Sequence, residues 1–526
     1  MTHSSHLLPC QVVQAVKIVK ALPFPCGIVH HKSPKVKKLR RPAANDVGVS
    51  RESMKRSWAI IVGLGALVWL GAAYALGVSV SELPQGWRLL AVFSSTIAGL
   101  LLQPLPGGAI VLTGLLVAVA CGALTMEQAL KGYADPTVWL VLAAYFLSRA
   151  LIQTGLARRL ALYFVRLLGR RSLGLGYAIV ASDVVLAGMI PSNAARVGGV
   201  LLPIVRNLAE LYRSQPGPSA ALLGTYLMLT LYQGDVMACA LFFTGQASNP
   251  LAAQQAYQLT AESASGPVVL SYREWLWHAS VPALLCLAVI PWWIYRWHGP
   301  EIRHTPEAPA FARQELERFG SLRPPEKVLG AVFVTVCGLW IVLGKDYVTL
   351  VALGGVVALF LTGVLRWHDA LEERSGWDVF IWYGGLVQLG KELHAAGIVR
   401  LFAEWSGGLF VGWSWPVTWV ALTIIYFYAH YGFASITTHM VSMYPAFAAV
   451  LIAGGAPPGL TVASLAFFAN FSAGLTHYGT TPGPIVFATG YVSQALWWRT
   501  GFALSLFNVA VWLTVGPCWW KITGLW

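Results

Sequence analysis

Charged residues are scarce in this sequence. Asp, Glu, Lys and Arg make up 11% of its 526 residues, whereas a soluble domain carries about 25%. Hydrophobic residues make up 56%, the mean hydropathy is +0.62, and apolar runs recur along most of the chain. A membrane-spanning helix needs about 20 such residues. Because the runs are continuous rather than alternating, they exclude a membrane β-barrel and predict an all-α polytopic membrane protein.

Signatures of enzymes and metal sites are also missing. The seven cysteines form no CxxC pair, so no disulfide or zinc framework is implied. The sequence contains no GxSxG, no HExxH and no GxxxxGK[ST] phosphate-binding loop. The lack of an ATP site favours a secondary carrier over an ATP-driven pump. We therefore expect no enzyme activity and no cofactor.

Acidic residues are absent from the first 45 positions. Met1–Arg56 holds eleven Lys and Arg residues and two acids, which gives nine of the fourteen net positive charges. The remaining charge is ordinary for cytoplasmic loops, so we do not expect nucleic-acid binding. The segment lacks the long apolar stretch of a secretory signal. It is either an organellar transit peptide or a mis-started tail before a true start at Met54, and the scarcity of Arg and Ser before residue 40 favours the second.

The apolar runs predict about eleven transmembrane helices and two re-entrant hairpins in two halves. The first half, 57–297, contains predicted spans at 57–78, 88–105, 109–124, 137–154, 220–243 and 275–297. After the fourth span, Leu156–Arg171 is basic and amphipathic, so it should lie along the membrane interface. Near 174–205, an apolar segment with a polar centre has basic residues on both flanks, which predicts the first hairpin.

A polar, proline-rich segment, 298–327, is expected to be a cytoplasmic linker. The second half, 328–526, contains an amphipathic stretch, Val399–Gly408 with Glu404, and a second hairpin near 416–452. Its predicted spans are 328–343, 348–365, 379–393, 461–489 and 502–520. Spans two to six match spans seven to eleven in the opposite orientation, which predicts an inverted repeat.

Four polar, Gly- and Pro-rich interruptions fall in two matched pairs. One pair is Ile190–Arg206 (IPSNAARVGGVLLPIVR) followed by Thr244–Pro250 (TGQASNP). The other is Phe433–Pro445 (FASITTHMVSMYP) followed by Thr476–Ile485 (THYGTTPGPI). At membrane depth, irregular backbone is tolerated only where it lines a cavity or is buried in protein. Matched interruptions in two halves indicate the binding site of a transporter.

These motifs resemble those of a known family. PSNAARVGGVLLPI is similar to the PSNTAR-type segment of the divalent anion:sodium symporters. FYAHYGFASITTHMVSMYP and LTHYGTTPGPIVFATGYVSQALWWRTGF resemble the subgroup that includes the bacterial citrate/succinate antiporter and the plastid 2-oxoglutarate/malate translocator. The resemblance runs from about Trp58 to the C-terminus and leaves out the basic tail.

The resemblance implies a homodimer with a fixed scaffold domain and a mobile transport domain in each protomer. It implies that a di- or tricarboxylate binds between two hairpin tips and two helix breaks, and that the transport domain moves like an elevator. The implied partners are carboxylate substrates, membrane lipid and a second copy of the chain. The implied location is the bacterial inner membrane, with the plastid inner membrane as the alternative.

The expected substrate-binding residues lie on the two tips and the two breaks. Hydroxyl groups, the asparagine amide and free N–H groups at helix starts can all donate hydrogen bonds to carboxylates. The resemblance and the residues themselves nominate Ser192, Asn193, Ala194 and Arg196, then Gly245, Ser248 and Asn249, then Ser435, Thr437, Thr438 and His439, and finally Thr480, Thr481, Pro482 and Gly483.

The sequence departs from the family at two positions. Ala194 stands where the first family triplet has threonine, which removes a hydroxyl. Ile436 stands where the second triplet of the sodium symporters has asparagine, which removes a carbonyl oxygen suited to Na⁺. The sequence therefore favours sodium-independent exchange. The alternative is a Na⁺-coupled symporter whose ions would be held at Ser192, Asn193, Gly245 and Thr437.

Buried ionisable residues leave several interpretations open. Arg196 either neutralises a substrate carboxylate, or stands in for a sodium ion, or pairs with a carbonyl or an acid such as Asp183; the electrostatic role is slightly favoured. Asp183 is expected to form a structural salt bridge rather than couple protons. Asp235 either carries a proton or, as favoured, faces a water-filled cavity. His439 either contacts substrate or is packed against backbone, and His430 is expected to be structural.

Overall fold

The computed structural model describes residues 51–79, 82–261, 263, 266–343, 345–398, 401 and 412–526. Every regular element in this part of the chain is a helix, and an isolated β-bridge joins Arg171 to His304. The predicted all-α class is thereby confirmed. Most of the basic tail and most of the amphipathic stretch with Glu404 lie outside the described residues.

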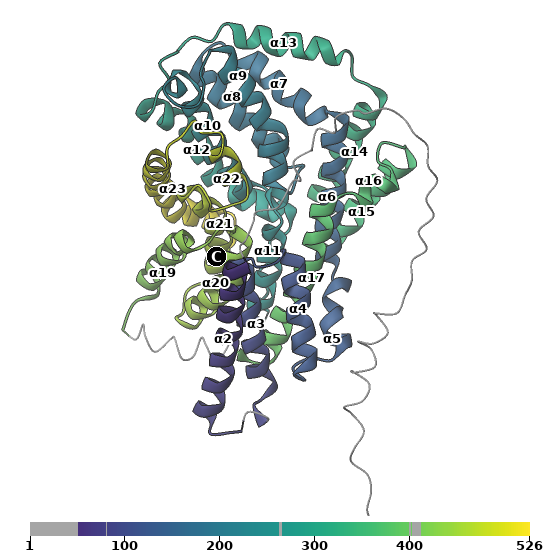
Figure 1. Cartoon of the computed structure of the whole chain (residues 1–526), viewed down its shortest axis with the longest axis vertical. Coiled ribbons are helices and arrows are strands. Elements are labelled where there is room, and N and C mark those ends of the chain that lie inside the picture. Colours follow the sequence, from purple (N-terminus) through teal and green to yellow (C-terminus); the bar gives the residue numbers. More distant parts are fainter. Residues whose placement is uncertain are drawn as a thin grey trace, which may run out of the picture. The chain divides into compact units, whose positions relative to one another are not determined.

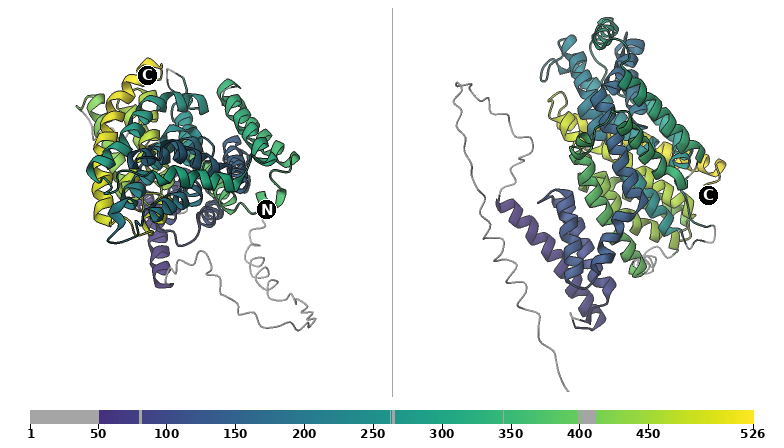
Figure 2. Two further views of the ribbon diagram at one scale, coloured as in Figure 1. Left: turned by 90° about the horizontal axis from the view of Figure 1, so that it is seen from above. Right: turned by 90° about the vertical axis from the view of Figure 1, so that its right-hand side faces the viewer.

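The first half begins with α2 (Arg51–Leu76) and α3 (Gln85–Leu102), which pack against each other as the purple pair in Figure 2. The helices that follow are α4 (Gly107–Ala120), α5 (Met126–Leu130), α6 (Pro136–Thr154), α7 (Leu156–Leu168), α8 (Ser172–Ala187), α9 (Leu202–Leu211), α10 (Gly224–Leu241), α11 (Ser248–Leu259) and α12 (Tyr272–Trp297). Shorter segments are η2 (Lys131–Ala134), η4 (Ala220–Leu222), η5 (Phe243–Gly245) and the π-helical η3 (Ala195–Leu201).

The linker contains one amphipathic helix, α13 (Glu307–Phe319), which packs on α7 (Figure 1). The second half then contains α14 (Pro324–Leu343), α15 (Val348–Leu361), α16 (Trp367–Leu371), α17 (Arg374–Ala395), α19 (Trp415–Ala429), α20 (Ile436–Ala453), α21 (Pro458–Phe471), α22 (Pro482–Phe487) and α23 (Gln494–Ile522). Its shorter segments are η6 (Lys345–Tyr347), η8 (His430–Gly432) and η9 (Ser472–Leu475).

The two halves run through the same order of elements. Each has a 14-residue apolar helix (α4, α15), a five-residue helix (α5, α16) and then a long helix (α6, α17). A helix–turn–helix follows in each, then an interrupted helix (α10–η5–α11, α21–η9–α22) and a long last helix (α12, α23). This order matches the repeat expected from the sequence, and the opposite orientation of the two copies across the membrane stays a prediction.

Eight helices in the described residues are long and apolar enough to cross a membrane: α2 from Met54, α3, α6, α12, α14, α20, α21 with its extension to Leu475, and α23. The helices α4, α8 and α15 are apolar but shorter. This number is roughly consistent with the eleven predicted spans. One detail differs, because α20, placed within the second hairpin by the sequence, has 18 residues and is long enough to span by itself.

Helix α10 holds the two halves together at the site. All of its residues except Thr225 are buried, which is unusual for a helix in lipid and indicates that it lies inside the protein. It packs against α8 and α12 of its own half and against α21 and η9 of the other half. The polar segments around the first turn and the second break therefore share one central support.

Candidate functional site

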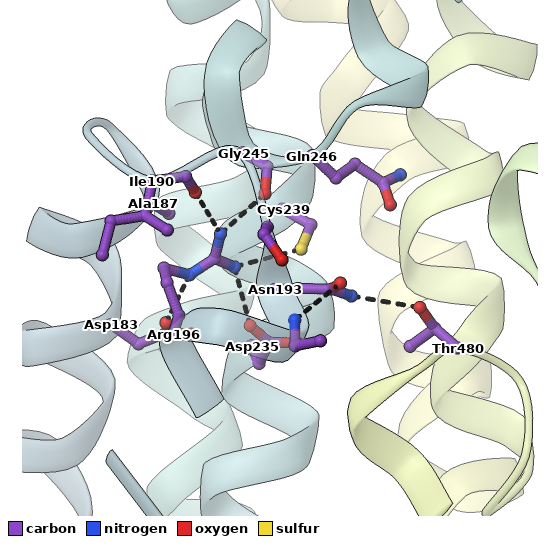
Figure 3. A network of polar contacts seen from close by, with 12 residues as sticks. Asp183, Ala187, Ile190, Asn193, Arg196, Asp235, Cys239, Gly245, Gln246 and Thr480 are labelled. Carbon is purple, nitrogen blue, oxygen red and sulfur yellow. Dashed lines mark hydrogen bonds and ion pairs between the residues drawn. The ribbon is translucent and has the colours of Figure 1, made fainter. Parts of the chain in front are cut away.

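The first polar turn connects α8 to η3, and the chain then returns alongside α8. Two polar side chains hold this turn through hydrogen bonds to backbone. Ser192 Oγ accepts from the Ala195 N–H at 3.2 Å, and Asn193 Oδ1 accepts from the Ala194 N–H at 3.0 Å. The Asn193 Nδ2 group points the other way and donates to Thr480 Oγ1 at 3.0 Å (Figure 3). The first turn is thus joined directly to the second helix break.

The second polar turn connects η8 to α20. Ser435 is the N-cap of α20, and its Oγ accepts from the Thr438 N–H at 3.3 Å. This residue type is expected at a helix start because its oxygen satisfies an otherwise free N–H group. The remaining free N–H groups of the first turn of α20 place partial positive charge at Ile436 and Thr437.

The first helix break lies between α10 and α11. Gly245 is required there, because a Cβ atom at this position would lie 2.5 Å from the Cys239 carbonyl oxygen. Interrupting a helix leaves carbonyl groups without partners. Asn249 supplies a hydrogen-bond donor for these carbonyls, because its Nδ2 donates to the carbonyls of Cys239 at 2.8 Å and Phe242 at 2.9 Å.

The second helix break lies between η9 and α22, and α10 stabilises it. Tyr232 Oη donates to the Ala473 carbonyl at 2.8 Å, and Gln233 Nε2 donates to the Gly474 carbonyl at 2.8 Å. Gly479 is required for the same reason as at the first break, because a Cβ atom there would lie 2.6 Å from the Ala473 carbonyl oxygen. Both breaks are therefore built and supported features of the fold.

A cavity of about 370 Å³ opens between the turns and breaks. Its lining includes eight of the residues nominated from the sequence, which all belong to the turns and the second break: Ser192, Asn193, Ala194, Ser435, Thr437, Thr438, Thr480 and Thr481. The structure thus brings together hydroxyl and amide groups from both halves, as the paired interruptions predicted.

The other nominated residues do not line this cavity: Arg196, Gly245, Ser248, Asn249, His439, Pro482 and Gly483. Several of them have structural tasks instead. Asn249 and Gly245 form the first break, and Gly483 must be glycine because a Cβ atom there would lie 2.6 Å from the His477 carbonyl oxygen. These residues shape the cavity rather than face it.

Arg196 lies behind the first turn and is completely buried (Figure 3). Its Nε donates to Asp183 Oδ1 at 2.8 Å, and its Nη2 donates to Asp235 Oδ1 at 2.7 Å and to Cys239 Sγ at 3.2 Å. Its Nη1 donates to the carbonyls of Ile190 at 2.9 Å and Gly245 at 2.7 Å. The guanidinium therefore links α8, α10, the first turn and the first break.

This network corrects two interpretations of the sequence. The sequence favours an electrostatic role in which Arg196 neutralises a substrate carboxylate directly. In the structure, all donor groups of Arg196 are directed at protein atoms and none faces the cavity. The sequence also predicts that Asp235 faces water, but Asp235 is fully buried and paired with Arg196. The structural salt bridge of Asp183 is confirmed.

The two histidines near the second turn form a similar but neutral support. His430 Nε2 lies 2.8 Å from the Gly479 carbonyl oxygen, and its Nδ1 lies 3.1 Å from His439 Nδ1. A carbonyl can only accept, so His430 Nε2 donates; in the neutral imidazole its Nδ1 then accepts from His439. His439 is buried and stacks on Tyr426 with the ring centroids 4.3 Å apart, and it does not line the cavity. Of the two roles that the sequence allows for His439, the structure therefore shows a packed side chain rather than a substrate contact.

The sequence missed the second wall of the cavity, by which we mean the lining residues that lie outside the turns and breaks. This wall is formed by residues of α3, α4, α6 and α17 and by Gln103. The residues are Leu100, Gln103, Gly107, Tyr145, Ser375, Asp378, Val379, Trp382 and Leu386. They lie within or beside ordinary apolar spans, where no motif marks them. Gln246 was also missed, although it lies inside the noted TGQASNP segment; it lines the cavity and donates from Nε2 to Asn470 Oδ1 at 2.5 Å.

Residues 54–526 match the model of a protein family described as "Sodium:sulfate symporter transmembrane region". The chain belongs to this family. It is therefore a multi-pass membrane transporter. The match covers both halves and all four interruptions, and the resemblance noted in the sequence is confirmed.

Several relatives match most of this chain. The chain is 39% identical to dicarboxylate transporter 1 of Arabidopsis thaliana chloroplasts over 450 residues, which are 84% of this chain and 79% of that protein. It is 39% identical to the putative malate transporter YflS of Bacillus subtilis over 470 residues, 89% and 96% of the two chains. It is 31% identical to the citrate/succinate antiporter of Escherichia coli over 488 residues, 88% and 98% of the two chains.

Solved structures support the fold. The Alcanivorax borkumensis YdaH transporter superposes with a TM-score of 0.51 at 13% identity, over 76% of this chain and 88% of that one. The Neisseria gonorrhoeae MtrF structure gives a TM-score of 0.52 at 15% identity, over 77% and 84% of the two chains. At these identities the likeness concerns the fold alone.

Proposed function

We propose that this protein is a secondary active transporter that exchanges di- or tricarboxylates, of the malate, succinate, 2-oxoglutarate, citrate or tartrate class, without sodium. The cavity supports a carboxylate substrate because hydroxyls of Ser192, Thr437 and Thr481 and the N-terminus of α20 offer neutral hydrogen-bond donors. Neutral donors suit a carrier, since charge-assisted contacts are stronger and slow release. The functions for which the relatives are named, dicarboxylate and malate transport and citrate/succinate antiport, point to the same substrates.

One observation carries the sodium-independent part of the proposal. The carbonyl oxygens of Ile190 and Gly245 converge behind the first turn, and carbonyl oxygens that converge in this way can replace the hydration shell of a cation. Here both accept hydrogen bonds from Arg196 Nη1. Two buried carboxylates hold the guanidinium in place, so a sodium ion would have to displace a charge that is already paired.

The second turn supports the same conclusion. The Gly479 carbonyl at the second break accepts a hydrogen bond from His430, and Ile436 offers no side-chain oxygen. Of the four residues nominated for sodium, Gly245 has its carbonyl bound to Arg196, and the side-chain oxygens of Ser192 and Asn193 accept hydrogen bonds from backbone N–H groups of the first turn.

The proposal includes an elevator-like motion in a homodimer. The cavity lies between two different walls: one made of turns and breaks, the other of α3, α4, α6 and α17. If the first wall belongs to a mobile transport domain and the second to a scaffold, sliding one past the other would expose the substrate to each side in turn. The proposed location is the bacterial inner membrane, with the plastid inner membrane as the alternative.

Exchange in proteoliposomes tests the proposal. Uptake of labelled malate would be followed with and without internal dicarboxylate, each with sodium and with choline in its place. We expect uptake that requires internal dicarboxylate and is unchanged by sodium. Uptake into empty vesicles driven by a sodium gradient would establish the symporter alternative, and a protein that moves no carboxylate under any condition would refute both.

A matched pair of variants links the activity to the cavity. Asn193→Ala removes a lining amide, whereas Asn508→Ala removes a buried amide of α23 that does not line the cavity and whose Oδ1 has no partner among the described residues. Exchange should be lost in the first variant and retained in the second. Equal activity of the two would remove the first turn from the binding site.

A further inference from the structure

The cavity contains a charge whose sign is unexpected for an anion site. Among the described residues that line it, Asp378 of α17 is the only charged side chain, and it is acidic. The guanidinium of Arg196 does not compensate for it, because Arg196 faces away from the cavity and is already paired with two carboxylates. An anion that enters the cavity therefore meets a negative charge and no positive side chain.

The position of Asp378 is built into the fold. Its Oδ1 accepts a hydrogen bond at 3.1 Å from the N–H of Gly108, in the first turn of α4. Gly108 permits this close approach, because a Cβ atom at that position would lie 2.9 Å from the same Oδ1 atom. The free N–H groups and positive end of a helix favour a carboxylate here. The carboxylate is thus held in place by α4 while Asp378 lines the same cavity as the two turns.

We propose that Asp378 is a specificity-determining residue that limits the charge of the transported anion, so that dicarboxylates are favoured over tricarboxylates. This inference rests on the proposed function and narrows its substrate class. The physical reason is that Coulomb repulsion grows in proportion to the charge of the substrate, so a trianion is penalised half as much again as a dianion. The repulsion is stronger near a protein wall than in bulk water and decreases as salt is added.

The competing explanation is that Asp378 only caps α4. The variant Asp378→Asn separates the two possibilities, because asparagine keeps an Oδ1 acceptor for the Gly108 N–H at the same reach but carries no charge. Asp378→Gln, which is also uncharged and carries an amide oxygen that can accept from the same N–H, replaces the first variant if that one does not fold. Glu372→Gln is the control, since it removes one negative charge from an exposed residue near the start of the same helix and outside the cavity.

The experiment measures competition in proteoliposomes that exchange labelled succinate. Unlabelled succinate and citrate compete at a pH where all carboxyl groups of citrate are ionised. We expect Asp378→Asn to lower the half-inhibitory concentration of citrate relative to that of succinate by about twofold to about thirtyfold. This is the range for one charge at a separation of about 8 Å, between a water-like and a protein-like dielectric constant. The gain should shrink as ionic strength rises, and Glu372→Gln should leave the ratio unchanged.

The outcomes distinguish this inference from the proposed function. If the unaltered protein exchanges carboxylates and Asp378→Asn leaves the citrate-to-succinate ratio unchanged, Asp378 is a helix cap only and the inference is overturned. The inference is also overturned if Glu372→Gln changes the ratio by the same factor as Asp378→Asn. If the unaltered protein exchanges no carboxylate, the proposed function itself has failed.

Discussion

The first turn and first break form one unit, and the second turn and second break form another. The two units have the same backbone arrangement but different side-chain chemistry. In each unit a glycine at the break passes within contact distance of a carbonyl six residues earlier, Cys239 for Gly245 and Ala473 for Gly479. In each unit the carbonyl of that glycine accepts a hydrogen bond from a side chain of the neighbouring turn. The distance is 2.7 Å from Arg196 Nη1 to Gly245 O and 2.8 Å from His430 Nε2 to Gly479 O.

The supporting groups differ in charge. Arg196 is a permanent cation held by two buried carboxylates, whereas His430 is backed by a second imidazole, His439. The comparison teaches that one carbonyl position can be satisfied either by an ionic network or by a neutral pair. The first solution costs far more to disturb, because its loss leaves buried charge without a partner. Substitutions in the two units should therefore cause losses of stability of different size, although the backbone geometry of the units is alike.

The largest effect is expected from Arg196→Gln. The substitution leaves Asp183 and Asp235 as two buried carboxylates without a cation, and breaking a buried ion pair costs about 3–5 kcal/mol. We expect little folded protein in the membrane and a strongly lowered Tm. Arg206→Gln is the control, because Arg206 lies on the same hairpin but is exposed and pairs only weakly with Glu210. Normal folding of the Arg196 variant would show that the network is dispensable.

A smaller and symmetrical effect is expected from Gly245→Ala and Gly479→Ala. The added Cβ atoms would meet carbonyl oxygens at 2.5 Å and 2.6 Å, so each variant should lose about 1–3 kcal/mol of stability. Gly199→Ala, where nothing lies within 4 Å of the added atom, should change little. Thermal unfolding in detergent measures all three. A large difference in lost stability between the Gly245 and Gly479 variants would mean that the backbones of the two units are not equivalent.

The next effect is expected from His430→Gln, which tests the neutral side of the comparison. The variant disturbs two uncharged hydrogen bonds, to Gly479 and His439, so the expected cost is about 1–3 kcal/mol and below that of Arg196→Gln. His368→Gln, an exposed position, serves as the control. A loss as large as that of the Arg196 variant would show that the imidazole pair is charged.

The smallest effect on stability is expected from Asn193→Ala, which removes the contact between the two units. Loss of the hydrogen bond to Thr480 should cost about 1 kcal/mol in the free energy of unfolding. Because Asn193 also lines the cavity, exchange should be lost although the fold remains. A double-mutant cycle with Thr480→Val isolates the link, and strictly additive costs would mean that the two units are not coupled through it.

The sequence predicted the elements of the fold well because each left a local signal. Apolar runs marked the helices, and polar residues beside Pro and Gly marked the four interruptions that meet at the cavity. The partners of Arg196 were harder to predict. Asp235 lies in α10, 39 residues after Arg196 in the sequence, and its apolar neighbours gave no sign that it would face a guanidinium.

The second wall of the cavity could not be predicted for a related reason. Ser375 and Asp378 lie at the start of α17, where polar residues are expected at the end of any membrane helix. Only tertiary packing of α17 against α4 brings Asp378 to the Gly108 N–H and into the cavity. Composition and spacing contain no information on that contact.

The most direct test of sodium-independent binding is the affinity of the purified protein for malate, titrated by calorimetry in sodium buffer and in choline buffer of equal ionic strength. Because Arg196 and His430 already hydrogen-bond to the carbonyls of Gly245 and Gly479 at the two breaks, we predict the same Kd in both buffers. A tenfold tighter Kd in sodium, equivalent to about 1.4 kcal/mol, would contradict this and place a sodium ion in the loaded site.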